Sequence, residues 1–209
     1  MTNKLALKYG QREFLASVRA ATTTLLKAAQ QYGSPGTEDT PRRVAEAWWE
    51  MLEGDRESPR EILGTVFESG EYDQMILVTN IDFWSTCEHH LLPFQGTAHV
   101  GYLPGWSSSD RDKTRVVGLS KIPRLVRCFA RRLQLQERMV SDVAESMMTH
   151  ETLRPRGVAV IANATHSCMA CRGVRSRGTM TTSVMLGEFR KSDALRQELL
   201  TLIALEHER

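Results

Sequence analysis

Two short runs of this sequence concentrate the residues that could do chemistry, Ser85-Thr86-Cys87-Glu88-His89-His90 and His166-Ser167-Cys168. Cys87 and His90 are three positions apart, so their thiolate and imidazole can converge on one ion within a single turn. His166 and Cys168 follow an apolar run, and on a strand both would project from the same face. Two thiolates and an imidazole favour zinc, and three protein ligands leave a fourth position for water. The spacing predicts a catalytic zinc site of Cys87, His90 and Cys168. A closed structural site is the alternative.

The two remaining histidines of these runs, His89 and His166, lie beside the predicted ligands. Histidine titrates near neutral pH, so we predict that both transfer protons to and from a substrate on the metal. Zinc lowers the pKa of a bound water toward ~7, which would supply a nucleophile at neutral pH. Simple support of the ligands is the alternative role for these histidines.

A basic group indicates an anionic substrate. Ser120, Lys121 and Arg124 lie in the first turn of a predicted helix, where free N–H groups and the helix dipole favour anions. Arg172 follows Cys168 by four positions. Beside a hydrolytic metal, this group predicts a phosphorylated substrate, although a solvated basic helix start would have the same composition.

Gln136 and Glu137 open the next predicted helix. A carboxylate beside a carboxamide can read adjacent N–H and carbonyl groups on the edge of a purine. A glutamate at this position can also act only as a partner of the helix dipole.

The elements that must position these residues alternate in kind. Apolar periodicity and turn residues predict helices and strands in a ββααββ order after an N-terminal helical hairpin. The helices are predicted over residues 11–32, 40–54, 120–133, 136–149 and about 195–203, and the strands over 75–83, 96–103, 116–118, 158–164 and 179–185. The order predicts an α+β fold with an antiparallel sheet and helices on one face. We divide the chain into a helical region, 1–60, and a catalytic domain, 61–209.

Composition limits the function classes. The net charge of +2 gives no basic field that would favour nucleic acid. No apolar run is long enough to span a membrane, and the N-terminus lacks the apolar core of a signal peptide. The four cysteines are too few for a disulfide scaffold. We therefore expect a soluble, cytoplasmic enzyme without nucleic-acid or membrane partners. The open edges of a four-stranded sheet favour continuation into another subunit.

Seven short runs of the sequence occur together in one order. They are Asp39-Thr-Pro-Arg-Arg-Val44, Cys87-Glu-His-His90, Val117-Gly-Leu-Ser-Lys121, Gln134-Leu-Gln-Glu-Arg138, His166-Ser-Cys-Met169, Arg172-Gly-Val174 and Leu186-Gly-Glu-Phe189. In these runs and in their order the chain resembles the GTP cyclohydrolase I family, and the resemblance extends over about residues 37–203.

The resemblance implies the tunnelling fold, in which the ββααββ sheets of several subunits join around a ring. It implies a toroidal homodecamer with active sites between subunits. The implied reaction is zinc-dependent attack on C8 of the guanine of GTP, release of formate, and rearrangement to 7,8-dihydroneopterin triphosphate. This step begins folate, pterin or 7-deazaguanine biosynthesis.

The resemblance also assigns roles to matching residues. His89 and His166 would move protons, and Glu137 with Gln136 would hold the guanine edge. Ser120, Lys121, Arg124 and Arg172 would bind the triphosphate, with Arg43 from a neighbouring subunit.

The sequence departs from the family pattern at three places. Cys171 completes a C-x-x-C with Cys168 and could close the zinc shell, which would leave a nucleotide-binding module with a structural zinc. The loop over residues 105–115 is longer than the usual hairpin, and the segment 175–178 is shorter. A zinc nucleobase deaminase fits less well, because that class needs a proline directly before its C-x-x-C.

Overall fold

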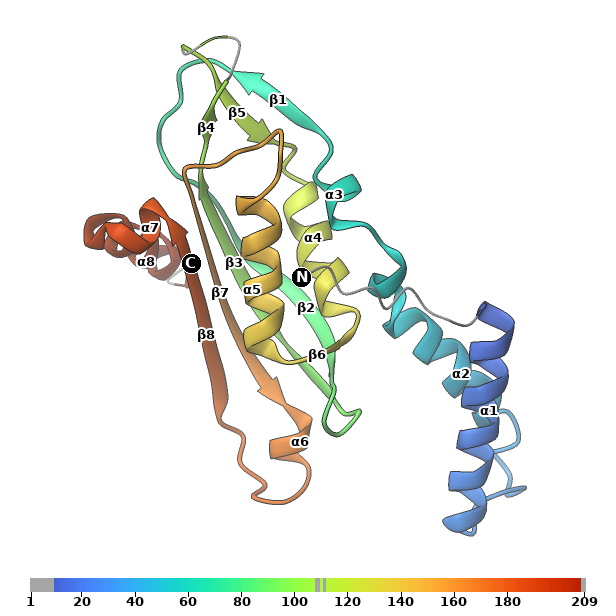
Figure 1. Cartoon of the computed structure of the whole chain (residues 1–209). Coiled ribbons are helices and arrows are strands. Elements are labelled where there is room, and N and C mark those ends of the chain that lie inside the picture. Colours follow the sequence, from blue (N-terminus) through green and yellow to red (C-terminus); the bar gives the residue numbers. More distant parts are fainter. Residues whose placement is uncertain (1–9, 108–109, 111, 208–209) are drawn as a thin grey trace. The chain divides into compact units, whose positions relative to one another are not determined.

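The computed structural model describes residues 10–107, 110 and 112–207 (Figure 1). The chain forms two compact units, Met1–Glu57 and Ser58–Arg209. The division predicted from the sequence was after residue 60. None of the described helices combines the length and apolar character needed to cross a membrane.

The first unit is a helical hairpin of α1 (Gln11–Ala28) and α2 (Thr40–Met51), followed by the short 3-10 helix η1 (Glu53–Arg56). The rings of Phe14 and Trp49 pack at 5.4 Å between centroids and join the two helices. α1 ends before the predicted Tyr32, and Gln30 then adopts a left-handed φ of 57°. The N-cap of α2 is Asp39, and Thr40 is the first helical residue.

The second unit is built on a five-stranded sheet in the order β6-β2-β3-β7-β8. Its long strands are all antiparallel: β2 (Ile76–Cys87), β3 (Pro93–Leu103), β7 (Gly157–His166) and β8 (Thr179–Gly187). Two helices connect the strand pairs, α4 (Lys121–Ala130) and α5 (Gln136–Met148). The predicted ββααββ order of an α+β fold is confirmed.

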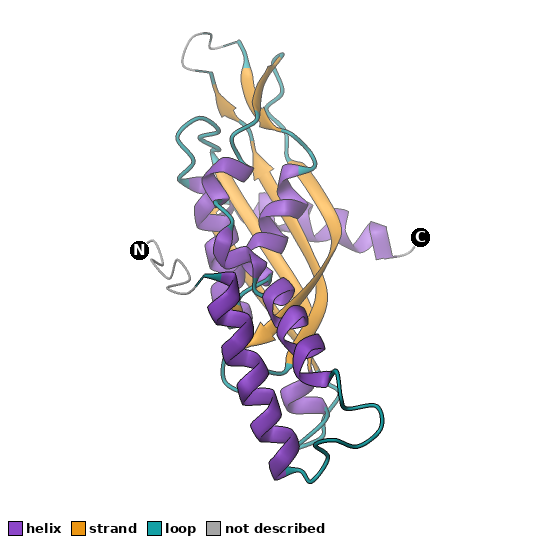
Figure 2. Ribbon diagram, turned by 90° about the vertical axis from the view of Figure 1, so that its right-hand side faces the viewer, coloured by secondary structure: helices purple, strands orange, loops and turns teal. Residues whose placement is uncertain are grey.

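Strand residues alternate between two hydrophobic clusters, as the pleat requires. Val158 and Val160 of β7 belong to the larger cluster, which α4 and α5 cover from one face of the sheet (Figure 1). Ala159 and Ile161 point to the opposite face and pack with Phe189. That face is covered at one end by α7 (Glu188–Lys191) and α8 (Asp193–His207). In Figure 2 the C-terminal helix accordingly lies behind the strands.

The predicted helix over residues 120–133 ends earlier than expected. α4 stops at Ala130, and Leu133 lies in the two-residue strand β6 (Leu133–Gln134). This strand pairs in parallel with the end of β2, Thr86 with Leu133 and Cys87 with Gln134. The connection between the two helices is thereby attached directly to the strand that carries the first predicted metal ligand.

A separate three-stranded sheet contains β1 (Val66–Ser69), β5 (Thr114–Val117) and β4 (Gly105–Trp106). It follows a short helix, α3 (Pro59–Ile62), whose first turn is capped by the Ser58 hydroxyl. The predicted return strand at residues 116–118 belongs to this sheet, and β1 was not predicted. Of the long loop noted in the sequence, residues 108, 109 and 111 lie outside the described residues.

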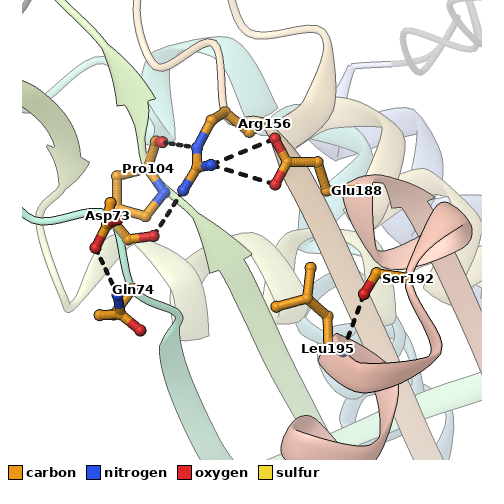
Figure 3. Close-up of polar contacts among 7 residues, drawn as sticks. All are labelled: Asp73, Gln74, Pro104, Arg156, Glu188, Ser192 and Leu195. Carbon is orange, nitrogen blue, oxygen red and sulfur yellow. Dashed lines mark hydrogen bonds and ion pairs between the residues drawn. The ribbon is translucent and has the colours of Figure 1, made fainter.

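Arg156 stabilises the end of the main sheet at which β3 ends and β7 begins (Figure 3). Its guanidinium donates to the carbonyl oxygens of Pro104, at 3.2 Å, and Asp73, at 2.6 Å. It also pairs with the Glu188 carboxylate at 3.2 Å. Gly187, at φ 61°, passes so close that a Cβ there would lie 2.2 Å from the Arg156 carbonyl oxygen. These contacts fix one end of β7, and the predicted metal ligands lie beyond its other end.

Candidate active site

The three predicted metal ligands come together at the far end of the sheet. The ligand atoms of Cys87, His90 and Cys168 all lie within 4.8 Å of one another. The Cys87 sulfur is 3.9 Å from Nδ1 of His90. Zinc binds thiolates at about 2.3 Å and imidazoles at about 2.0–2.1 Å, so small side-chain movements would let all three bind one ion.

The electrostatics of the group also fit a cation. The pKa of the Cys168 thiol is raised, first by burial and then by the charge and hydrogen bonding of Cys87. Two thiolates so close together repel each other, and a bound divalent cation would remove that repulsion. The donor set is therefore one that zinc fits.

Two of the ligands lie on the turn between β2 and β3. The Cys87 N–H donates to the Leu92 carbonyl at 2.9 Å, and the Leu91 N–H donates to the Cys87 carbonyl at 2.8 Å. Leu91 adopts a left-handed φ of 55°, which is uncommon for a residue other than glycine. The turn leaves Cys87 buried and His89 and His90 exposed, with their rings edge to face at 6.2 Å between centroids.

Cys168 reaches the group from a helical turn and not from a strand. β7 ends at His166, and Cys168 lies in the following short helix, α6 (Ser167–Ala170). The prediction that His166 and Cys168 share a strand face is therefore wrong. The β3–β7 register sets His166 opposite Phe94, and the two rings stack at 4.5 Å with 5° between their planes. This stacking orients the imidazole beside the ligand group.

Gln136 holds the other edge of His166. The Gln136 Oε1 lies 2.8 Å from His166 Nε2, and its Nε2 donates to Ala162 O, Met180 O and Thr182 Oγ1 at 3.0 Å each. Because two of these neighbours are carbonyls, the amide nitrogen must face them, and its oxygen must accept from His166 Nε2–H. His166 therefore carries its proton on Nε2 and leaves Nδ1 as an acceptor. Burial lowers the pKa of His166, so the ring is neutral at pH 7.

This placement differs from the expected role of Gln136. Its side chain is 1% exposed, and both ends of its amide are used inside the protein, so it does not offer an edge to a substrate. Glu137, the next residue, is exposed on the first turn of α5. Its charge raises the pKa of His166 against the larger effect of burial, which lowers it.

A sequence model of the GTP cyclohydrolase I family matches residues 18–204. The chain belongs to the GTP cyclohydrolase I family. It is 46% identical to GTP cyclohydrolase 1 of Brucella canis over 198 residues, which cover 94% of this chain and 87% of the relative. It is also 46% identical to that of Wolinella succinogenes over 166 residues, 79% of this chain and 83% of the relative. The crystal structure of the archaeosine synthase QueF-Like in the apo form aligns with TM-score 0.42 and 14% identity over 56% of this chain and 96% of that one.

In this member of the GTP cyclohydrolase I family, Cys171 stays apart from the metal group. It is an exposed free thiol at the end of α6, and the described ligand group contains Cys87, His90 and Cys168 without it. The geometry gives no support to a fourth thiolate that would close the site. Arg172 is exposed and close enough that its charge lowers the pKa of Cys168 against the larger effect of burial.

The other predicted anion-binding residues lie far from the metal group of the same chain. Ser120 is the N-cap of α4, followed by Lys121 and Arg124. α4 runs along β2 in the same direction, and its C-terminal end leads to β6 beside Cys87. Ten residues at about 1.5 Å each put the start of α4 on the order of 14 Å farther up the strand. Arg43 lies in α2 of the first unit.

Arg124 lines a cavity of about 500 Å³ between α4 and the open edge of β2. Two further arginines, Arg127 and Arg131, line the same cavity, together with Asn80 and Trp84 of the strand. The cavity therefore combines guanidinium groups with an edge of β2 that pairs with no other described strand over residues 78–84.

Glu88 and Arg138 were overlooked in the sequence. The Arg138 guanidinium bonds the Glu88 carboxylate within the metal-binding turn, and its Nε donates to Gln134 Oε1 at 2.9 Å. The sequence did contain a signal for this ion pair, because Glu88 lies in the run Cys87-Glu-His-His90 and Arg138 lies in the run Gln134-Leu-Gln-Glu-Arg138.

Proposed function

We propose that this chain is a GTP cyclohydrolase I that uses zinc. It would hydrolyse GTP at C8 of guanine, release formate and form 7,8-dihydroneopterin triphosphate. The observation that carries the proposal is the convergence of Cys87, His90 and Cys168 beside an oriented, neutral His166, in a member of this family. Zinc bound by those three residues would lower the pKa of a water molecule toward ~7 and act as a Lewis acid.

His166 serves as the proton acceptor of the site. Gln136 keeps its Nε2 protonated and Phe94 holds its plane, so Nδ1 is available to take a proton. His89 is exposed on the metal-binding turn and is suited to exchange protons with solvent. Glu137 accepts two hydrogen bonds from the N–H groups on the guanine edge, which is a pattern that adenine does not present.

The triphosphate is bound by Ser120, Lys121, Arg124 and Arg172, with Arg43 contributed by another subunit. The start of α4 is on the order of 14 Å from the metal group of its own chain, a separation that favours binding of one GTP by parts of two chains. A neighbouring copy would supply the missing part. Within the described chain, β8 and residues 76–85 of β2 have no strand on their outer sides, so edge pairing can build the oligomer. We propose a toroidal homodecamer.

The cellular setting follows from the same proposal. All four cysteines are free thiols, which suits a reducing cytoplasm. The product would enter folate, pterin or 7-deazaguanine biosynthesis.

The direct test is incubation of zinc-loaded protein with GTP, with measurement of formate and of pterin fluorescence after oxidation. We expect both products in equal amounts, and neither from Cys87→Ser. Formate without pterin would indicate ring opening that stalls before rearrangement. Absence of both products from protein with bound zinc would favour the nucleotide-binding module with a structural metal.

A further inference from the structure

The metal-binding turn is tied to α5 by one ion pair. Arg138, in the first turn of α5, bonds the carboxylate of Glu88, which lies between Cys87 and His89. The side chains are partly exposed, 42% for Arg138 and 30% for Glu88. Fifty residues separate the two in sequence, so the pair joins elements that the chain brings together only by folding.

The guanidinium is itself held in place. Arg138 Nε donates to Gln134 Oε1 at 2.9 Å, and a terminal nitrogen donates to the Leu133 carbonyl at 3.2 Å. Gln134 is buried, and its amide nitrogen donates to the Phe129 carbonyl at 3.1 Å. An ordinary surface ion pair is weak because two flexible side chains must be ordered. Here the arginine is already ordered by neighbours on the α4–α5 connection.

The turn needs such support. Backbone hydrogen bonds fix its ends, including Glu88 N–H to the Gln134 carbonyl at 3.1 Å. Its outer part carries the exposed ligand His90 and the left-handed Leu91. Left-handed conformations of residues other than glycine persist only where surrounding contacts enforce them. Among the described side chains of the turn, Glu88 makes the polar contact to α5.

We propose that Arg138 and Glu88 are positioning residues for the metal, which hold the turn so that His90 faces Cys87 and Cys168. This inference rests on the metal site of the proposed function. It also explains the arrangement of α5: Gln136 orients His166, Arg138 orients the metal-binding turn, and Glu137 between them stays exposed. One helical turn thus fixes the proton acceptor relative to the metal ligands.

The test compares metal binding by full-length Glu88→Gln, Arg138→Gln and the double variant. Cobalt(II) replaces zinc, because its thiolate charge-transfer and d–d absorption bands report ligand number and geometry. Affinity is measured by competition with a chromogenic chelator. The matched control is Glu151→Gln, which removes an exposed ion pair with Arg60 at 2.7 Å in the same unit. Hydrogen exchange of the metal-free proteins over residues 85–92 gives a readout independent of metal.

We expect each single variant to bind cobalt at least about 10-fold more weakly, as is usual when a group supporting a ligand is lost. The double variant should bind cobalt no more weakly than the weaker of the two single variants. It should also show altered d–d bands and faster hydrogen exchange over residues 85–92. Arg138→Lys should recover only part of the affinity, because lysine lacks the planar fork that bonds Glu88 and Gln134 together. The control should match the wild type.

If each single variant binds cobalt with an affinity within about twofold of the wild type, the proposal is overturned, because an ordinary exposed ion pair would have an effect that small. Losses that multiply in the double variant, or full recovery by Arg138→Lys, would also overturn it. GTP turnover by the wild type is measured separately. An inactive wild type that binds cobalt would count against the proposed reaction, and the affinities would still decide the role of Arg138.

Discussion

The Nε2 atom of His166 lies 2.8 Å from Oε1 of Gln136, and this contact sets the tautomer of the imidazole. It joins a residue at the end of β7 to one at the start of α5. The nitrogen at the other end of the Gln136 amide donates to carbonyl oxygens of β7 and β8. The histidine is therefore oriented by the sheet and the helix together.

Replacing Gln136 by methionine should reduce both stability and turnover. The change preserves volume but leaves the buried Ala162 carbonyl without this donor, at a cost of about 1–3 kcal/mol for a buried group left unsatisfied. Urea unfolding and GTP turnover measure the two effects. Gln197→Met, at an exposed position of α8, is the control and should change neither. Wild-type turnover in Gln136→Met would show that the tautomer of His166 is not set by this contact.

Removal of the metal should inactivate the protein without unfolding it. The ligands lie at one end of the sheet, while the larger cluster is packed by α4 and α5 along its length. We expect chelation to abolish turnover, keep the far-ultraviolet circular dichroism and allow recovery on addition of zinc. Cys171→Ser should retain one metal per chain, and Cys168→Ser should lose it. Cooperative unfolding on chelation would favour a structural site.

Sequence periodicity predicted α4 and α5 because each buries one continuous stripe against the sheet, as with Ile122, Leu125 and Val126. The metal ligands were predictable because two of them are close in sequence and their residue types are chemically distinctive. β1 was missed because its four residues do not alternate clearly in polarity. Leu133 was placed in a helix because apolar spacing continues past Ala130, whereas pairing of β6 with β2 ends the helix there.

The partners of Gln136 and Arg138 could not be predicted from one sequence. Gln136 bonds residues 26 to 46 positions away, and Arg138 bonds Glu88 across 50 positions. Such contacts depend on strand register and on the packing of α5 over the sheet, which local patterns do not encode. For that reason the sequence assigned Gln136 to the substrate, although its neighbours in space are protein groups.

Gly96→Ala should destabilise the sheet strongly. A Cβ at Gly96 would lie 1.8 Å from the Asn163 carbonyl oxygen and 2.7 Å from Ala164 Cα, so β3 and β7 would have to separate. We expect a loss of about 3 kcal/mol or more in urea unfolding, at or above the upper end for overpacking. Gly101→Ala, in the same strand, is the control, because its nearest neighbour is a side-chain atom of Leu199 at 3.1 Å and not backbone, so a shift of a few tenths of an ångström would relieve the contact. Equal losses in the two variants would contradict the close approach at Gly96.

The Asp142 carboxyl group should lower the free energy of unfolding as the pH rises through its pKa in the folded protein. Burial raises its pKa above 3.8, although Gln134 and two arginines oppose the shift. The folded state then binds more protons than the unfolded state between 3.8 and the raised pKa, so its contribution to stability is complete below that window and is lost above it. Asp142→Asn should therefore raise the free energy of unfolding at pH 7 more than at pH 3.5. A difference independent of pH would show that burial does not control this carboxyl group.

Glu137→Gln should abolish turnover of GTP with only a small effect on the fold. The side chain is exposed, so the free energy of unfolding should change by less than about 0.5 kcal/mol. Guanine offers two neighbouring N–H donors. The NH2 group of a glutamine amide is itself a donor, so it could not accept a hydrogen bond from one of them. Sites that hydrogen-bond such groups can discriminate by about 10⁴-fold or more, so we expect a loss of that order in kcat/KM. Inosine triphosphate, which lacks the 2-amino group, should be a poor substrate of the wild type for the same reason. If the wild type uses both nucleotides equally well, Glu137 does not read the guanine edge.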